Sequence, residues 1–85
     1  MEEVFYTYVV QSLKDDTYHY KGHCSDLETR LKQHNSGQTK SIKHKAPFEI
    51  AYFEISETRA EAVKKEKYWK TAAGRRYLQA KMKAS

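Results

Sequence analysis

Residues 4–11, Val-Phe-Tyr-Thr-Tyr-Val-Val-Gln, decide the fold because all but the last are β-branched or aromatic. A strand that is apolar on both faces needs cover on both faces, so we expect it at the centre of a sheet. Residues 14–16, Lys-Asp-Asp, then form a turn signal. Residues 17–23 alternate, with Tyr18, Tyr20 and Gly22 on one face. This pattern predicts a second strand with one half-buried face, and the short connection predicts an antiparallel hairpin.

A capping box marks the start of the first helix. Ser25 is the expected N-cap and Glu28 is the residue that reaches back to it. Leu27 and Leu31 share one face of this helix, because residues four apart are neighbours on a helix. Gly37 is well placed to end it, since glycine adopts the left-handed conformation that terminates many helices.

The second half of the chain predicts one strand and two more helices. A second capping box, Thr58 with Glu61, marks the start of a helix that we expect to run to about Ala72. Gly74 is expected to interrupt it. The remaining predicted segments are a basic loop at residues 38–46, a strand at residues 48–55 and a short helix at residues 75–83.

This order of elements, β-β-α-β-α-α, predicts an α+β fold in which helices cover a small, mostly antiparallel sheet. With 85 residues, the chain is long enough for one domain, residues 1–85.

The charge is unevenly distributed. The chain has 16 Lys and Arg residues against 11 Asp and Glu residues, a formal net charge of +5. No acid lies between Glu28 and Glu49, and residues 64–83 hold eight basic residues and one acid, whereas Glu2 and Glu3 lie near the start. Such asymmetry favours an anionic partner, with nucleic acid first. Solvated lysines on helix surfaces would explain the same composition.

Other features exclude several classes of protein. A single cysteine, Cys24, rules out an internal disulfide and a Cys-rich zinc site. No apolar run approaches the roughly 18 residues of a membrane span. The opening Met-Glu-Glu-Val lacks the order of a signal peptide. We therefore expect a cytoplasmic protein in a reducing compartment, without a membrane partner. No long apolar stripe remains for a partner subunit, so we expect a monomer.

One carboxylate stands out because it interrupts an apolar stripe. Ala62, Val63, Trp69 and Ala73 have helical spacing, and Glu66 falls in the middle of their face. An unpaired buried carboxylate costs several kcal/mol, so Glu66 needs a cation, a metal ion or several donors. One interpretation is a structural salt bridge to a lysine or arginine. The other is a ligand for a hard divalent cation, which prefers oxygen donors.

Arg30 and His34 form a second suggestive pair, since they lie one turn apart on the first helix. Arg30 also borders the Leu27 and Leu31 stripe, which places it near the sheet. A guanidinium there can hold a phosphate through two parallel hydrogen bonds. The alternative is a surface arginine paired with a nearby acid such as Asp26.

Taken together, four segments resemble the GIY-YIG nuclease family, in particular its small stand-alone bacterial members of the YhbQ-like (UPF0213) type. The motif named for Gly-Ile-Tyr falls on Tyr6-Thr7-Tyr8, and the motif named for Tyr-Ile-Gly falls on Tyr20-Lys21-Gly22. Residues 25–37 resemble the helix that carries an Arg and a His and ends in Asn-Ser-Gly, and residues 65–69 resemble the segment with the metal-binding Glu. Departures are Tyr6 for Gly, Thr7 for Ile, and Lys21 for an apolar residue that would point away from Tyr20.

The resemblance implies a fold of three antiparallel strands flanked by three helices. It also implies a metal-dependent endonuclease that hydrolyses phosphodiester bonds with one Mg²⁺ or Mn²⁺ ion. Glu66 would bind the metal, and Arg30 would bind the nonbridging phosphate oxygens. Tyr8 would orient or deprotonate the attacking water with help from Tyr20, and His34 would relay a proton or contact the phosphate. A tyrosine acting as a base at neutral pH needs a nearby cation to favour the phenolate.

The expected substrate is nucleic acid, with DNA favoured over RNA. The biological pathway is left open between DNA repair and recombination. The residues expected to follow its backbone are Lys40, Lys43, Lys45, Arg75 and Arg76. The main alternative is a non-catalytic nucleic-acid-binding module with the same fold. A protein-interaction domain whose basic surface meets an acidic partner is a further alternative.

Overall fold

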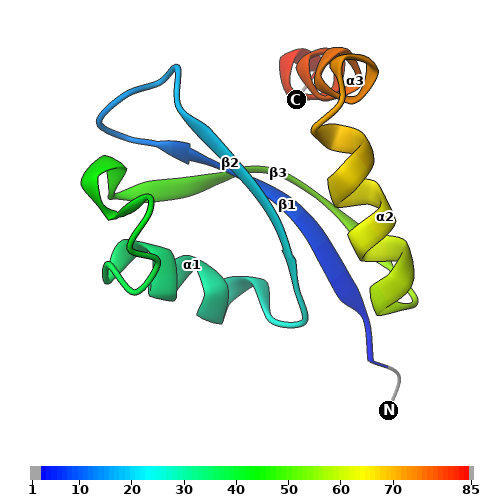
Figure 1. Cartoon of the computed structure of the whole chain (residues 1–85), viewed down its shortest axis with the longest axis horizontal. Coiled ribbons are helices and arrows are strands. Elements are labelled where there is room, and N and C mark those ends of the chain that lie inside the picture. The colour runs from blue at the N-terminus through cyan, green and yellow to red at the C-terminus, as the bar shows by residue number, and fades with distance from the viewer. Residues whose placement is uncertain (1–2, 85) are drawn as a thin grey trace.

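A computed structural model describes residues 3–84, so Met1, Glu2 and Ser85 lie outside the described part of the chain. Within it, three strands and three helices form the predicted α+β fold, in the predicted order (Figure 1). The elements are β1 (Phe5–Ser12), β2 (His19–Cys24), α1 (Leu27–Asn35), a short 3₁₀ turn η1 (Lys43–Lys45), β3 (Phe48–Ser56), α2 (Arg59–Trp69) and α3 (Ala72–Ala84).

The sheet is antiparallel with strand order β2-β1-β3, so β1 is central, as its apolar sequence predicted. Helix α1 covers one face of the sheet, and α2 and α3 cover the other (Figure 1). Side chains of a strand alternate between faces. Consequently Tyr8 and Val10 join the cluster beneath α1, whereas Val9 joins Trp69 and Leu78 beneath α2 and α3.

The start of α1 differs from the prediction by one residue. Asp26, not Ser25, is the N-cap, and its carboxylate accepts a hydrogen bond from the backbone N–H of Thr29 at 3.1 Å. Both residue types are good N-caps, and a carboxylate gains further stabilisation from the helix dipole. The predicted end of the helix is confirmed, because Gly37 follows the C-cap Ser36 with a φ of +83°.

The break between α2 and α3 also differs from the prediction. Helix α2 begins at the predicted N-cap Thr58 but ends at Trp69 rather than near Ala72. Gly74 does not interrupt a helix and instead lies buried in the first turn of α3. A Cβ atom there would stand 1.9 Å from the carbonyl oxygen of Tyr68, so only glycine allows α3 to pack this closely on the end of α2. Ala73 is exposed and does not extend the apolar stripe of α2.

Across residues 3–84, every helix falls short of the length and apolar character that a membrane crossing requires.

Candidate active site

The site begins with a phenol held beneath a glycine. Tyr8 on β1 and Gly22 on β2 are partners in the antiparallel register. A Cβ atom on Gly22 would lie 2.6 Å from the Tyr8 hydroxyl, so the glycine makes room for the end of the tyrosine ring. That hydroxyl shares a 2.8 Å hydrogen bond with Nε2 of His34 on α1. The other ring nitrogen, Nδ1, shares a 2.9 Å hydrogen bond with the Thr39 hydroxyl.

Tyr20 completes this group from β2. Its ring meets the His34 ring edge-on, with centroids 5.3 Å apart. The three side chains differ in access to solvent: Tyr8 and His34 are each 1% exposed, while Tyr20 is half-buried. Part of Tyr20 is therefore accessible to solvent, whereas Tyr8 and His34 are not.

Burial controls the protonation of the inner pair. It raises the pKa of Tyr8 well above its ordinary value, and this outweighs the opposing effect of the Arg30 charge. Burial also lowers the pKa of His34, and Arg30 adds to that effect. Both groups are neutral at neutral pH. The Arg30 charge acts in the direction expected of a nearby cation and favours the phenolate, but desolvation of Tyr8 is the larger effect.

Arg30 lies on the exposed side of α1, in a shallow pocket also lined by Cys24, Asp26 and Gln33. Within residues 3–84, its guanidinium forms no ion pair with Asp26 or with any other acid. The alternative of a structural ion pair with Asp26 is thus not observed. The Arg30 charge still lowers the pKa of Tyr8 and of His34, so the guanidinium lies within electrostatic range of both groups.

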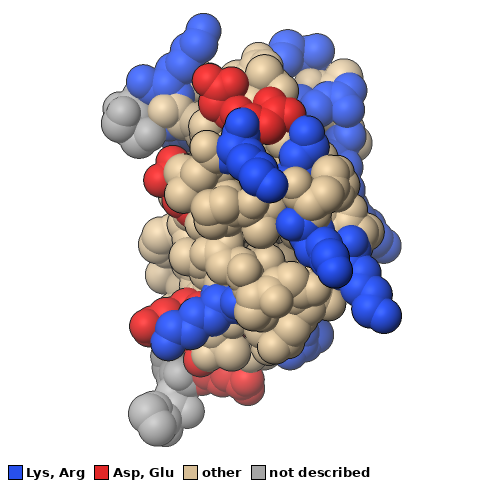
Figure 2. All heavy atoms as spheres, turned by 90° about the vertical axis from the view of Figure 1, so that its left-hand side faces the viewer, with Lys and Arg blue, Asp and Glu red and all other residues tan. Residues whose placement is uncertain are grey.

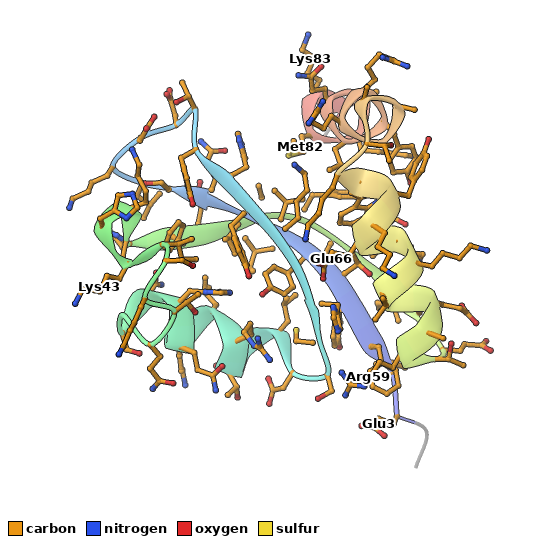
Figure 3. The ribbon with its side chains drawn as sticks, in the orientation of Figure 1. Glu3, Lys43, Arg59, Glu66, Met82 and Lys83 are labelled. Atoms are coloured by element: carbon orange, nitrogen blue, oxygen red, sulfur yellow. The ribbon has the colours of Figure 1, made fainter. Side chains whose placement is uncertain are left out.

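Glu66 points from α2 toward the sheet, and its side chain is 18% exposed (Figure 3). One oxygen, Oε1, lies 2.6 Å from Nδ1 of His23 on β2. The other, Oε2, accepts a 2.7 Å hydrogen bond from Nζ of Lys70. Burial alone would raise the pKa of Glu66, but the hydrogen bonds from Lys70 and His23 outweigh it and hold the pKa below its ordinary value. The carboxylate is therefore ionised at neutral pH.

The two halves of the site flank strand β2. Tyr20 and Gly22 face the α1 side, whereas His23 faces α2 and holds Glu66. The Glu66 charge contributes to the raised pKa of Tyr8, so the carboxylate lies within electrostatic range of the phenol. The structure thus places the five sequence-predicted catalytic residues around one short segment of β2. They are Tyr8, Tyr20, Arg30, His34 and Glu66, and direct contacts join only Tyr8, Tyr20 and His34.

Comparison with known proteins identifies the family of the chain. The family model described as the GIY-YIG catalytic domain matches residues 4–79. This chain belongs to the GIY-YIG family. Its similarity extends to a UPF0213 protein of Staphylococcus saprophyticus, which is 36% identical over 74 residues, covering 86% of this chain and 88% of the relative. A UPF0213 protein of Haloquadratum walsbyi is 31% identical over 67 residues, covering 78% of this chain and 73% of the relative.

Membership of the GIY-YIG family makes this a domain of a nuclease family that binds nucleic acid and generally depends on divalent metal ions. In residues 3–84, no group of three or more His, Cys, Asp and Glu side chains gathers as a metal site would. The carboxylate of Glu66 nevertheless suits a hard cation, which binds through one carboxylate and keeps several water ligands. His23 orients that carboxylate, as partners of metal ligands commonly do.

The basic residues predicted to follow nucleic acid are split between two regions of this GIY-YIG domain. Lys40 and Lys43 are exposed near η1, but Lys45 is bound to Asp15 at 2.8 Å and stacks on Tyr18. Arg75 and Arg76 are exposed on α3. Figure 2 shows most of the Lys and Arg atoms of one face along its upper and right-hand margins, with uncharged surface in the middle.

Sequence reasoning missed His23, the direct partner of Glu66. The signal in the sequence was the position of His23 on the second strand: it follows Gly22 and shares a strand face with Lys21, so it points away from Tyr20. The reasoning also missed a second carboxylate network, in which Glu54 accepts hydrogen bonds from Tyr52 at 2.6 Å and from Tyr77. Phe53 is 44% exposed on β3, apolar surface that the sequence pattern did not indicate.

Proposed function

We propose that this protein is a metal-dependent endonuclease that hydrolyses phosphodiester bonds in DNA. The observation that carries the proposal is Glu66, a half-buried ionised carboxylate held beside β2. Both it and the unpaired Arg30 lie within electrostatic range of Tyr8. Hydrolysis needs an activated water, stabilisation of charge on the phosphoryl oxygens and an easier departure of the leaving group.

Arg30 is the residue that binds the nonbridging phosphate oxygens. It is exposed and has no acidic partner among the described residues, and a guanidinium matches a phosphate through two parallel hydrogen bonds. Charge develops on those oxygens in the transition state, so the interaction strengthens as the reaction proceeds.

Burial exchanges the roles expected for the two tyrosines. Tyr20 is half-buried and can contact the attacking water, whereas Tyr8 is 1% exposed. We therefore assign Tyr20 to orienting the water, and we assign Tyr8 and His34 to positioning Tyr20. The Tyr8–His34 hydrogen bond fixes the imidazole against which the Tyr20 ring packs.

Glu66 is the residue that would hold a Mg²⁺ or Mn²⁺ ion, with His23 keeping the carboxylate in place. A bound divalent cation neutralises phosphate charge and stabilises the departing oxygen. Lys70 is compatible with this role, because its side chain is 56% exposed and its flexible stem can move off the carboxylate.

Lys40 and Lys43 would add sequence-independent attraction to the nucleic-acid backbone. A monomer, a cytoplasmic location and a pathway in DNA repair or recombination complete the proposal. The buried free thiol of Cys24 suits a reducing compartment.

A non-catalytic nucleic-acid-binding module is the second candidate function. It is favoured by one observation, which is that both oxygens of Glu66 already have protein partners. In that case His23 and Lys70 would hold the carboxylate permanently, and the domain would bind nucleic acid without cutting it.

Cleavage assays separate the two candidates. The purified protein is incubated with labelled single-stranded, nicked and branched DNA, with and without Mn²⁺, beside Glu66→Ala and Arg30→Ala. Lys67→Ala is the matched control, because Lys67 is exposed on the same helix as Glu66. We expect Mn²⁺-dependent cutting by the wild type and the control, none by Glu66→Ala, and cutting slowed about 10²–10³-fold by Arg30→Ala. Binding without scission under every condition would support the non-catalytic module, and cutting by Glu66→Ala would refute the metal assignment.

A further inference from the structure

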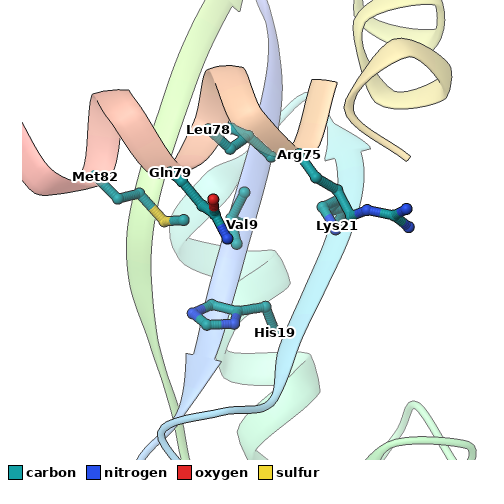
Figure 4. A pocket seen from close by; sticks show the side chains of 7 residues that line it. All are labelled: Val9, His19, Lys21, Arg75, Leu78, Gln79 and Met82. Carbon is teal, nitrogen blue, oxygen red and sulfur yellow. The ribbon is translucent and has the colours of Figure 1, made fainter. Parts of the chain in front are cut away.

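A small cavity opens between β2 and α3, on the α2 and α3 side of the sheet (Figure 4). Its volume is about 130 Å³. Three apolar side chains, Val9, Leu78 and Met82, line its floor. Polar groups from both elements line the rest, including Lys21 and His19 from β2 and Arg75 and Gln79 from α3. The cavity therefore combines an apolar surface with a cationic edge.

The cationic edge is not neutralised by the protein. Lys21 and Arg75 lie close together at one end of the cavity in Figure 4. Neither side chain forms an ion pair with an acid of residues 3–84. Lys21 is half-buried, and burial together with the charges of Arg75 and Lys70 lowers its pKa. Like charges held together without an acid favour an anion, and a phosphate would relieve their repulsion.

The apolar floor and the small volume of the cavity restrict which chemical group can be attached to the bound anion. Val9 and Leu78 are almost completely buried and back the cavity, whereas Met82 is half-buried and supplies the apolar surface that a ligand can reach. Pockets for drug-sized ligands usually measure about 300–1,000 Å³, so a cavity of about 130 Å³ accepts one small group only. A single nucleobase attached to a phosphate matches both parts, with its ring on the floor and its edge near the His19 and Gln79 polar atoms.

The cavity adjoins the proposed metal site. Lys21 and His23 are two residues apart on β2 and face the same side, a spacing of roughly 7 Å. His23 contacts Glu66, and Lys70, which also contacts Glu66, acts electrostatically on Lys21. A strand with one phosphate at Glu66 can therefore extend along β2 toward Lys21.

We propose that this cavity binds one unpaired nucleotide of the substrate strand, with its phosphate between Lys21 and Arg75 and its base against Met82, over the apolar wall that Val9 and Leu78 form. The proposal rests on the proposed function and specifies its substrate class: single-stranded, frayed or branched nucleic acid. In a duplex the base is stacked, and flipping it out costs a few kcal/mol, so an intact duplex cannot use the cavity freely.

Binding measured without metal ions tests the proposal independently of cleavage. Fluorescence anisotropy in EDTA follows a short oligothymidylate, an abasic strand of equal length and a duplex of equal length. Wild type is compared with Lys21→Gln and with Lys67→Gln, an exposed control. For the oligothymidylate, Lys21→Gln should lower the slope of log K against log salt by about 0.7, the value of one single-strand phosphate contact. Lys67→Gln should leave the slope unchanged. The wild type should bind the oligothymidylate at least about fivefold more tightly than the abasic strand, as expected for one base on a protein surface.

Two results overturn the proposal while leaving the nuclease function standing. Equal slopes for Lys21→Gln and Lys67→Gln would show that the cavity edge takes no phosphate. Equal affinity for the abasic strand and the oligothymidylate would show that its floor takes no base. If the wild type binds none of the three nucleic acids, the proposed function itself fails. Thermal melting of each variant confirms that the fold is retained.

Discussion

The packing of the Tyr8 hydroxyl against Gly22 allows a quantitative prediction for Gly22→Ala. The added Cβ would lie 2.6 Å from the Tyr8 oxygen and 2.9 Å from its Cζ. Tyr8 is 1% exposed and bound to His34 at 2.8 Å, so its ring has no free volume into which to retreat. The substitution must therefore displace either strand β2 or the tyrosine.

Two effects set the cost. Inserting a carbon into a well-packed core costs about 1–3 kcal/mol. Losing the Tyr8–His34 hydrogen bond adds about 1 kcal/mol. We expect Gly22→Ala to lower the free energy of unfolding by about 2–4 kcal/mol in total. For a domain of this size, each kcal/mol corresponds to roughly 4–8 °C, so the melting temperature should fall by at least about 8 °C.

Urea denaturation, followed by the fluorescence of Trp69, the single tryptophan, measures this loss. Gly37→Ala is the first control: its φ of +83° makes alanine cost about 1 kcal/mol, but no atom lies within 3.8 Å of the new Cβ. The second control repeats Gly22→Ala in a Tyr8→Phe background, where part of the penalty should disappear because the nearest oxygen is gone. A stable Gly22→Ala protein, or a penalty unchanged by Tyr8→Phe, would refute the packing argument.

Three further predictions follow from the same geometry. Arg30→Ala should change the free energy of unfolding by less than about 0.5 kcal/mol, because Arg30 is exposed and unpaired. It should nevertheless slow cleavage about 10²–10³-fold, and an unchanged cleavage rate would exclude a role of Arg30 in binding phosphate. Burial and the Arg30 charge lower the pKa of His34, so between that pKa and about 6.5 the unfolded state binds more protons, and stability falls as the pH drops through this range. In urea titrations, the free energy of unfolding of His34→Gln should depend less on pH than that of the wild type. An equal pH dependence in the two proteins would contradict a buried neutral imidazole. Gly74→Ala should abolish cooperative thermal melting or lower its midpoint sharply, because its Cβ would stand 1.9 Å from the Tyr68 carbonyl oxygen; a wild-type midpoint would show that the two helices can separate at little cost.

Local sequence signals predicted most of the fold correctly. The β-branched and aromatic run at residues 4–11 placed β1 at the centre of the sheet, because such a segment needs cover on both faces. Thr58 and Gly37 marked helix ends through side-chain and backbone preferences that operate within a few residues. The errors were also local: Asp26 competed with its neighbour Ser25 for the N-cap, and Gly74 was interpreted as a breaker although it serves the packing of α3 on α2.

The site was less predictable because it depends on contacts between distant segments. Helical spacing indicated that Glu66 was inward-facing, but nothing in α2 indicates that His23 from β2 would meet it. The motif named Tyr8 and Tyr20 alike, and only the packing of α1 on the sheet shows that Tyr8 is buried while Tyr20 reaches the surface. Desolvation, which sets the direction of the Tyr8 pKa, is likewise a property of the assembled core.

The central claim is that Glu66 holds a divalent cation beside the Tyr20 and Arg30 groups, and NMR with substoichiometric Mn²⁺ tests it most directly. Paramagnetic broadening is strongest for nuclei nearest the ion. We predict that broadening centres on Glu66 and His23, extends to Tyr20, and vanishes in Glu66→Gln. Broadening that centres on the Asp15 and Asp16 turn, or that persists unchanged in Glu66→Gln, would contradict the account.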